Sequence, residues 1–365
     1  MKTSFKIGTV MGIDIKLHIT FLMVLPIFAM VFAVNSAPYG FADIEPPLQY
    51  VLSLLCAVLL FACVLLHELG HSYFAQKYGF KVDNITLFLI GGISSMEEIP
   101  RDPAQEAKMA FAGPMVSFAI GSILLTSNFV LSYLLPTYTL TPPYRLVLIL
   151  GSINIVLGVF NLLPAFPMDG GRILRAWYAR KMSYVEATHT AANIGKMFAL
   201  LMALLGIISS PWNPWLLMIA IFVYMGASGE DRSTTVTTTL EKVKVRDVMT
   251  PDVVSVPPSL TIEQLTQFMF EHKHMGYPVM EHDVLKGIVT FTDVRKVMSP
   301  ERFSALISDV MTRDVVSIAV DAPASDAFKL VTSNNIGRLI VMDDYVVVGI
   351  LSRTDLMHTM TLLSE

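Results

Sequence analysis

The stretch VLLHELGHSYFAQ, residues 64–76, contains three side chains whose types and spacing suit a metal site. His67 and His71 are four residues apart, so on a helix they lie about 40° apart and face one point. Glu68 lies about 100° round from His67, within reach of a water held there. The pattern H-E-x-x-H is a zinc-binding signature in which two neutral imidazoles hold the ion. The spacing therefore predicts a zinc site with Glu68 as its general base.

The apolar context of this motif bears on whether the match arises by chance. Residues 48–66 contain no charged side chain, so the motif ends a segment apolar enough for a membrane. Each ionisable group at membrane depth costs roughly 2.5–3.5 kcal/mol on insertion scales, and such groups usually have a function. A cluster of polar side chains at the inner interface is the alternative. The cost of three such groups together favours the functional interpretation.

A catalytic zinc keeps three protein ligands and leaves one position open, so a third ligand is needed. Glu97 and Glu98 are near in sequence, but they lie in a polar stretch, ISSMEEIP, where solvated carboxylates are expected. Asp169, in NLLPAFPMDGGR, is the only acidic residue between Glu106 and Glu186. Two prolines before it break the helix, and the Gly-Gly after it should loosen the chain, so its carboxylate could turn into a helix bundle. A simple turn aspartate is the alternative.

Charge divides the chain into two parts that must position these residues. Residues 1–230 contain 25 charged side chains, about 11%, and residues 231–365 contain 31, about 23%. The first part therefore reads as a polytopic α-helical membrane domain and the second as soluble. Segments of about 20 apolar residues span a bilayer. Six spans are expected, two of them in a block that SSPWNPW interrupts: about 17–35, 48–72, 110–135, 144–165 and the block 194–227.

The distribution of Lys and Arg predicts the orientation. Basic residues gather at the N-terminus, in 73–109 and in 166–196, and the loops at 36–47, 136–143 and 209–213 contain none. By the positive-inside rule, the N-terminus and the soluble tail should both be cytosolic, in a multi-pass protein of the cell membrane. A cleaved signal peptide over residues 1–36 is the alternative, but it would leave five spans and break the alternation. The net charge of −4 gives no indication of nucleic acid binding. The two cysteines, Cys56 and Cys63, lie in an apolar segment and are expected to be buried free thiols.

The two motifs together resemble the site-2 protease family of intramembrane zinc metalloproteases. HELGH in an apolar helix is followed by NLLPAFPMDGGR in a later one, in the order and spacing typical of that family. The resemblance covers roughly residues 1–228. It implies that His67, His71 and Asp169 are zinc ligands and that Glu68 is catalytic. It also implies that Asn161 lies near the substrate or the oxyanion. The expected activity is peptide hydrolysis in or near transmembrane segments, as in regulated intramembrane proteolysis.

Two further stretches resemble the same family less specifically. FLIGGISSMEE, residues 88–98, is expected to form a short strand, a Gly-Gly turn and a polar segment, whose strand edge could bind an unwound substrate. An ordinary loop is the alternative. AGPMV, residues 112–116, resembles a Gly-Pro motif of the family, and helix packing or a kink is the favoured interpretation.

An internal repeat occupies the soluble part after a small, Thr-rich segment, 228–242, which is expected to be a linker. RDVMTPDVVSV begins at Arg246 and SDVMTRDVVSI at Ser308, and GIVTFTDV and GILSRTDL begin at Gly287 and Gly349, so both offsets are 62 residues. A shared period indicates duplicated units that pack together. The units resemble CBS domains, and the predicted boundaries are 1–227 for the protease domain, 243–300 for the first CBS domain and 301–365 for the second. This gives an α/β tandem pair.

The CBS resemblance implies an adenine nucleotide, such as ATP or AMP, in the clefts of the pair, and it also suggests a homodimer formed through the pair. Asp293 and Asp355 match the position that accepts from ribose hydroxyls, and Thr290 and Ser352 match the hydroxyls on the phosphate side. Both aspartates could instead be residues that favour a helix N-terminus.

Taken together, the sequence predicts a polytopic zinc protease with a transmembrane protein substrate and a nucleotide-sensing tail. The alternative is a CBS-regulated metal transporter or sensor, or a pseudoprotease, that uses the same three ligands without proteolysis. The presence of Glu68 argues against this alternative, and so does the scarcity of ionisable groups in the other spans.

Overall fold

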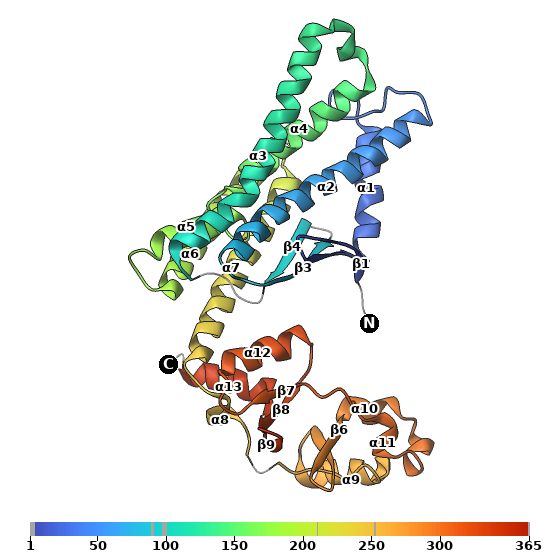
Figure 1. Ribbon diagram of the computed structural model, residues 1–365, viewed down its shortest axis with the longest axis vertical. Coiled ribbons are helices and arrows are strands. Elements are labelled where there is room, and N and C mark those ends of the chain that lie inside the picture. The colour runs from blue at the N-terminus through green and yellow to red at the C-terminus, as the bar shows by residue number, and fades with distance from the viewer. Residues whose placement is uncertain (1–3, 89–90, 97–100, 210, 252, 364–365) are drawn as a thin grey trace. The chain divides into compact units, whose positions relative to one another are not determined.

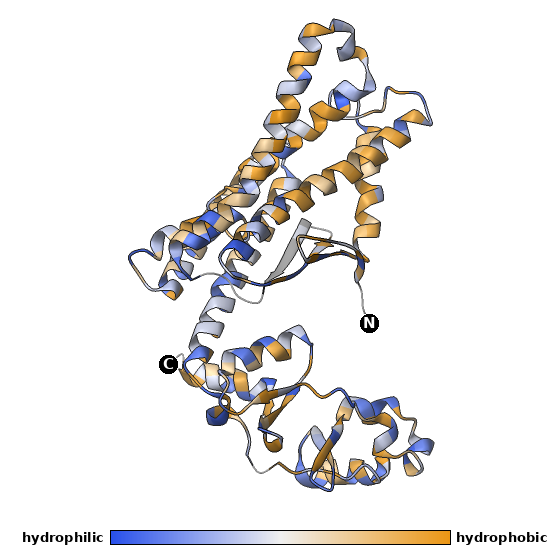
Figure 2. Cartoon of the chain, viewed as in Figure 1, coloured by the Kyte–Doolittle hydropathy of each residue, from blue (hydrophilic) through white to orange (hydrophobic). Residues whose placement is uncertain are grey.

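A computed structural model describes residues 4–88, 91–96, 101–209, 211–251 and 253–363 (Figure 1). The chain divides into two compact units, Met1–Asp231 and Arg232–Glu365. Figure 2 shows that hydrophobic residues dominate the helices of the first unit, whereas hydrophilic and hydrophobic residues mix throughout the second.

Seven helices belong wholly or partly to the first unit, together with a short 3-10 helix at Pro136–Leu140. They are α1 (Phe21–Val34), α2 (Leu48–Lys77), α3 (Pro103–Leu134), α4 (Pro142–Asn161), α5 (Asp169–Tyr178), α6 (Tyr184–Ile208) and α7 (Pro214–Glu241). Within the described residues, α2, α3, α4 and α6 are long and apolar enough to cross a membrane. The polytopic α-helical character predicted from the sequence is thus present in four helices.

The predicted count of six spans depends on α1 and α7. The first expected span, 17–35, contains a helix of only 14 residues, because residues 17 and 18 end a β-strand instead. At 1.5 Å per residue such a helix is about 21 Å long, short of the roughly 30 Å of hydrocarbon. α7 is long, but its C-terminal half is polar. The interruption between the last two helices lies where SSPWNPW predicts it, and the count of six stays a prediction.

A four-stranded sheet, which the sequence analysis did not anticipate, precedes and follows α1 and α2. Its strands are β1 (Ser4–Val10), β2 (Ile13–His18), β3 (Val82–Phe88) and β4 (Gly91–Met96), in the order β1-β2-β3-β4. β2 and β3 pair in parallel, and the outer pairs are antiparallel. Ile13 and Ile15 are buried on one face of β2, as its alternating pattern requires. β3 and β4 contact α2, and β4 is a terminal strand of this sheet (Figure 1).

Glycines allow the helices of the first unit to approach closely. A Cβ atom at Gly121 of α3 would lie 2.9 Å from the Gly151 carbonyl oxygen of α4, and one at Gly70 of α2 would lie 3.1 Å from the Ala112 carbonyl oxygen of α3. Small residues at such positions are typical of packed membrane helices. Cys56 and Cys63 are buried free thiols on α2, which confirms the prediction.

The second unit contains the repeat as two similar α/β halves. The first half has α8 (Val245–Val248), α9 (Ile262–His272), β5 (Gly276–Glu281), β6 (Val284–Thr290), α10 (Phe291–Lys296) and a 3-10 helix at Ser299–Phe303. The second has α11 (Ile307–Val310), β7 (Ser317–Ala319), α12 (Ala324–Ser333), β8 (Arg338–Asp343), β9 (Val346–Ser352) and α13 (Arg353–Leu363). In both halves an antiparallel hairpin leads into a helix, β5-β6 into α10 and β8-β9 into α13.

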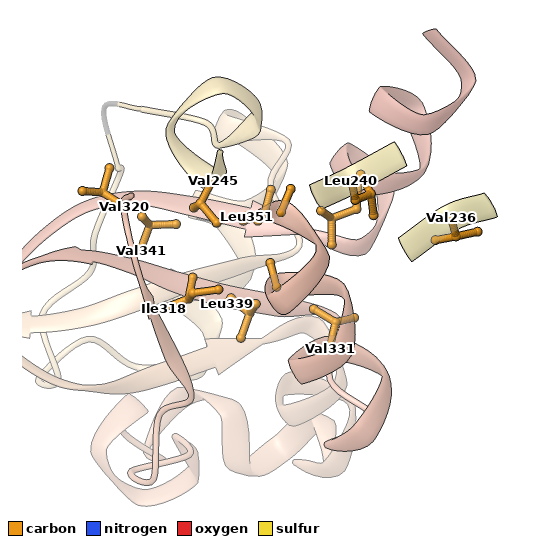
Figure 3. Packing of buried hydrophobic residues seen from close by; sticks show 12 residues of the cluster. Val236, Leu240, Val245, Ile318, Val320, Val331, Leu339, Val341 and Leu351 are labelled. Atoms are coloured by element: carbon orange, nitrogen blue, oxygen red, sulfur yellow. The ribbon is translucent and has the colours of Figure 1, made fainter. Parts of the chain in front are cut away.

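The segment expected to be a linker, 228–242, is helical as far as Glu241 and forms the C-terminal part of α7. Val236 and Leu240 lie one helical turn apart on this part, and both are buried in a cluster with Val331, Leu339 and other residues of the second half (Figure 3). This apolar pair explains why the segment is ordered, although its threonines suggested an irregular linker.

Candidate metal centre

Three side chains from two helices converge on one point in the first unit. His67 and His71 come from α2, and Asp169 is the first residue of α5. The Nε2 atoms of the two histidines are 3.2 Å apart, and Oδ2 of Asp169 is 3.4 Å from His67 Nε2 and 3.2 Å from His71 Nε2. All three residues are buried, with at most 8% of their surface exposed. Among the described residues, this is the group of His, Cys, Asp and Glu that could hold a metal ion.

The size of this triangle fits zinc. Zinc binds histidine nitrogen at about 2.0–2.1 Å and carboxylate oxygen at about 2.0–2.2 Å, with tetrahedral angles. Two such ligand atoms are therefore about 3.3–3.5 Å apart. The observed sides of 3.2, 3.2 and 3.4 Å leave room for one ion at the centre of the three atoms.

Hydrogen bonds on the far side of each imidazole set its orientation. Nδ1 of His71 is 2.8 Å from the carbonyl oxygen of Met109, and Nδ1 of His67 is 2.9 Å from the hydroxyl of Ser117, both on α3. A carbonyl oxygen only accepts, so Nδ1 of His71 carries the proton, and in the neutral ring Nε2 presents a lone pair. A hydrogen bond of this kind on the distal nitrogen is usual for a metal-binding histidine.

Gly113 on α3 provides the space beside the two Nε2 atoms. A Cβ atom there would lie 2.2 Å from Nε2 of His71 and 2.6 Å from Nε2 of His67. Gly113 lies in the interior of α3, with Pro114 next to it, so AGPMV is part of a helix and does not start one. The residues thus fit a zinc ion by donor type, by spacing and by clearance.

The Gly-Gly pair after Asp169 holds the aspartate tightly, contrary to the expectation that it would loosen the chain. A Cβ atom at Gly170 would lie 2.2 Å from the Leu163 carbonyl oxygen, and one at Gly171 would lie 2.6 Å from the Phe166 backbone nitrogen. The first turn of α5 therefore packs directly on the backbone of the turn that follows α4. The carboxylate of Asp169 at the start of α5 also suits the partial positive charge of a helix N-terminus.

Glu68 lies on α2 next to His67 and packs against β4. A Cβ atom at Gly92 would lie 2.5 Å from Cγ of Glu68 and 3.4 Å from its Oε1 atom. Glycine at this position of the strand thus allows the terminal strand of the sheet to reach the side chain of Glu68. The pair Gly91-Gly92 belongs to β4, so the expected Gly-Gly turn is instead part of a strand.

Asn161 is the last residue of α4, and its side-chain amide donates to the carbonyl oxygen of Leu157 at 3.1 Å. None of the hydrogen bonds found between described residues joins Asn161 to the three converging side chains, so its proposed role stays a prediction. The other candidate ligands, Glu97 and Glu98, lie outside the described residues.

Comparison with known proteins places this geometry in a family. The model of peptidase family M50 matches residues 55–140 and 136–204, and the CBS domain model matches 245–300 and 307–361. The zinc metalloprotease MJ0392 of Methanocaldococcus jannaschii is 38% identical over 363 residues, which cover 100% of this chain and 98% of that protein. The chain belongs to peptidase family M50.

Two further similarities concern the separate parts of this M50 protease. The solved site-2 protease from Methanocaldococcus jannaschii is 39% identical, covers 63% of this chain and 95% of that chain, and superposes with a TM-score of 0.44. The CBS domain-containing protein YhcV of Bacillus subtilis is 33% identical over 31% of this chain and 81% of that protein. The resemblance to the site-2 proteases, the zinc metalloprotease activity and the tandem CBS domains are confirmed.

In the CBS pair of this M50 protease, the candidate nucleotide residues form two similar contacts. Oδ2 of Asp293 accepts from the hydroxyl of Thr290 at 2.7 Å, and Oδ2 of Asp355 accepts from the hydroxyl of Ser352 at 2.7 Å. Each contact also includes the backbone nitrogen of the hydroxyl residue, as at a helix N-terminus. Both aspartates thus have the capping role that was the alternative interpretation.

The two sites differ in their surroundings. Ser352 and Asp355 line a cavity of about 140 Å³, together with Thr250 and Tyr277 of the first half and Arg338 of the second. Asp293 is instead bound by Lys296 at 2.8 Å. Arg338 is 62 residues after Gly276, so the repeat places a cation in one half where the other has none.

Several residues of this site escaped the sequence analysis. Met109, Ser117, Gly113 and Gly92 act through their backbone, a hydroxyl or the lack of a side chain, and no motif marks such roles. The Gly-Pro pair inside an apolar helix was the one available signal for Gly113. Arg338 could have been found from its place in the repeat.

Proposed function

We propose that the protein is an intramembrane zinc protease that hydrolyses peptide bonds in or near transmembrane segments of membrane proteins. His67, His71 and Asp169 hold the zinc, and Glu68 is the general base. The observation that carries the proposal is the buried triangle of three ligand atoms, with Glu68 next to it on a helix long enough to cross a membrane.

Each residue has a distinct task in this proposal. A bound zinc ion would polarise the scissile carbonyl group and acidify the attacking water. Glu68 takes the proton from that water and gives it to the leaving amine, as one carboxylate can do in both steps. Asn161, at the end of α4, is proposed to orient the substrate or the developing oxyanion through its amide. The hydrogen bonds from Met109 and Ser117 keep the imidazoles in place during the reaction.

The substrate must be unwound, because helical amides are hydrogen-bonded and shielded. β4 is the terminal strand of its sheet and contacts α2 beside Glu68, so its edge suits an extended peptide added as a further strand. We propose that the cleaved segment pairs there.

The test compares the wild type with Glu68→Gln at matched zinc content, using purified full-length protein and a panel of single-span reporter substrates. Cleavage by the wild type alone supports the proposal. Cleavage by both points to a contaminant or to another base. A variant with normal cleavage would overturn the role of Glu68. If neither cuts and zinc exchanges readily, the result favours the alternative of a metal transporter or sensor, or of a pseudoprotease.

The CBS pair is proposed to bind an adenine nucleotide and to regulate the protease. The cavity beside Asp355 supports this, because it brings a carboxylate, the Ser352 hydroxyl and the Arg338 cation to one place. These groups suit a ribose and a phosphate. The distribution of Lys and Arg supports a cytosolic location for the N-terminus and for this pair, and dimerisation through the pair stays a prediction. Adding AMP or ATP to the cleavage assay tests the regulation, and an unchanged rate at saturating nucleotide would contradict it.

A further inference from the structure

Arg175 is a fully buried cation on α5 that the proposed reaction does not use. None of its side chain is exposed, and the guanidinium carbon lies 5.0 Å from the ring centre of Phe166 and 4.8 Å from that of Tyr184. A buried arginine needs ionised partners, because an uncompensated charge away from water is very costly.

Two carboxylates from other helices provide this compensation. Oε1 of Glu106, on α3, is 2.8 Å from Nε and 2.6 Å from Nη2 of Arg175. Oε1 of Glu230, on α7, is 2.6 Å from Nη1. Glu106 is fully buried, whereas the side chain of Glu230 is 30% exposed. One guanidinium group therefore joins α5 to both α3 and α7.

The same two helices, α3 and α5, also hold the zinc ligands in place. On α3, Met109 accepts the hydrogen bond from His71 and lies three residues after Glu106, on the next turn. On α5, Asp169 lies six residues before Arg175, which is about 9 Å along a helix. A tilt of α5 by about 10° at Arg175 would thus move Asp169 by about 1.6 Å. Zinc ligands tolerate only about 0.2 Å.

We propose that Arg175 is a positioning residue for the zinc site: by binding Glu106 and Glu230 it fixes α5 so that Asp169 meets the two histidines. The inference rests on the proposed zinc ligands. A contribution to stability alone would not require this arrangement, because apolar residues of similar volume often replace a buried ion pair without loss. The planar fork of arginine, held by two carboxylates, sets both the distance and the angle between the helices.

The experiment uses the zinc-loaded full-length protein in detergent micelles. We would measure zinc release to an excess of a colorimetric chelator, together with kcat and KM for a reporter substrate. The variants are Arg175→Met, Arg175→Lys and Glu230→Gln, with Arg180→Met as the matched control, because Arg180 is exposed just after α5. Size-exclusion chromatography reports whether each variant remains folded.

We expect Arg175→Met to release zinc about 10–100-fold faster, as for other residues that support a metal ligand. kcat should fall while KM changes little. Arg175→Lys should recover part of the loss, and Arg180→Met should match the wild type. If Arg175→Met does not fold, Glu230→Gln decides, because its partly exposed site tolerates the change better, and it should still speed zinc release.

Wild-type zinc release from a folded Arg175→Met, or from Glu230→Gln where the former is unfolded, would overturn the inference. A separate control, Asp169→Ala, tests the site itself. If Asp169→Ala binds zinc as tightly as the wild type, the proposed ligand set is wrong. If it loses zinc while Arg175→Met does not, only the positioning role of Arg175 fails.

Discussion

Replacing Gly113 by alanine should disrupt zinc binding, although the substitution adds a single methyl group. Alanine is favoured over glycine in a helix interior by about 1 kcal/mol, so the change should not weaken α3 by itself. The harm comes from the two histidines of α2. The new Cβ atom would lie 2.2 Å from Nε2 of His71 and 2.6 Å from Nε2 of His67.

The size of the effect follows from these distances. Ordinary contacts of a Cβ atom begin at 3.4 Å, so the ring of His71 would have to retreat by about 1.2 Å. The ring cannot do this freely, because its Nδ1 atom is bound to the carbonyl oxygen of Met109 on the same helix. Separation of the two helices would break that bond and also the bond between His67 and Ser117. A shift of about 1.2 Å exceeds the tolerance of a zinc ligand about sixfold.

We therefore expect Gly113→Ala to fold, to hold much less than one zinc per chain and to lose proteolytic activity. Elemental analysis of the purified protein gives the zinc content, and the reporter assay gives the activity. Gly229→Ala is the matched control, because Gly229 lies in helix α7 with no atom within 4 Å of an added Cβ. A folded Gly113→Ala protein with full zinc and unchanged activity would refute the reasoning.

Three further predictions concern other parts of the molecule. Gly92→Ala should lower kcat at unchanged zinc content, because its Cβ atom would lie 2.5 Å from Cγ of Glu68, and parallel zinc and cleavage assays check this. Asp355→Asn should weaken AMP binding by about tenfold or more in calorimetry, since it removes a charged hydrogen-bond acceptor beside a cavity, whereas Asp293→Asn should have less effect because Lys296 already binds that carboxylate. Burial alone would raise the pKa of Asp293, but hydrogen bonds from Lys296 and its helix N-terminus hold the pKa below its ordinary value. This ion pair should therefore stabilise the second unit above about pH 4 and lose that effect as the pH falls through the lowered pKa, and Lys296→Met should reduce this pH dependence in hydrogen exchange.

Apolar length and motif spacing predict much of the first unit. The apolar stretches of α2, α3, α4 and α6 mark those helices, and HELGH marks the zinc helix, because both signals are local in the sequence. The sheet was missed because β1 and β2 lie in a basic arm whose only structural signal is a short alternation around Ile13 and Ile15. β2 pairs with β3, about 70 residues further on, and such a pairing depends on partners that local patterns do not reveal.

The linker shows the same limit in the second unit. A run of small residues and threonines suggests irregular structure, but two apolar residues one turn apart, Val236 and Leu240, are buried in the core of the second unit. Packing of this kind stabilises a helix more than local propensity does. The repeat, by contrast, could be predicted well, because its two copies report on each other.

The cost of burying a charge singled out the zinc motif, and the same argument explains Arg175 and Glu106. His67 and His71 stand out because the 19 residues before them are uncharged. Glu106 and Arg175 lie in stretches with other charged residues, which the sequence analysis assigned to inner loops where charges are solvated. Only the fold shows that these two are fully buried and paired. A charge in a loop beside a membrane helix therefore needs a structure before it can be assigned to solvent or to a site.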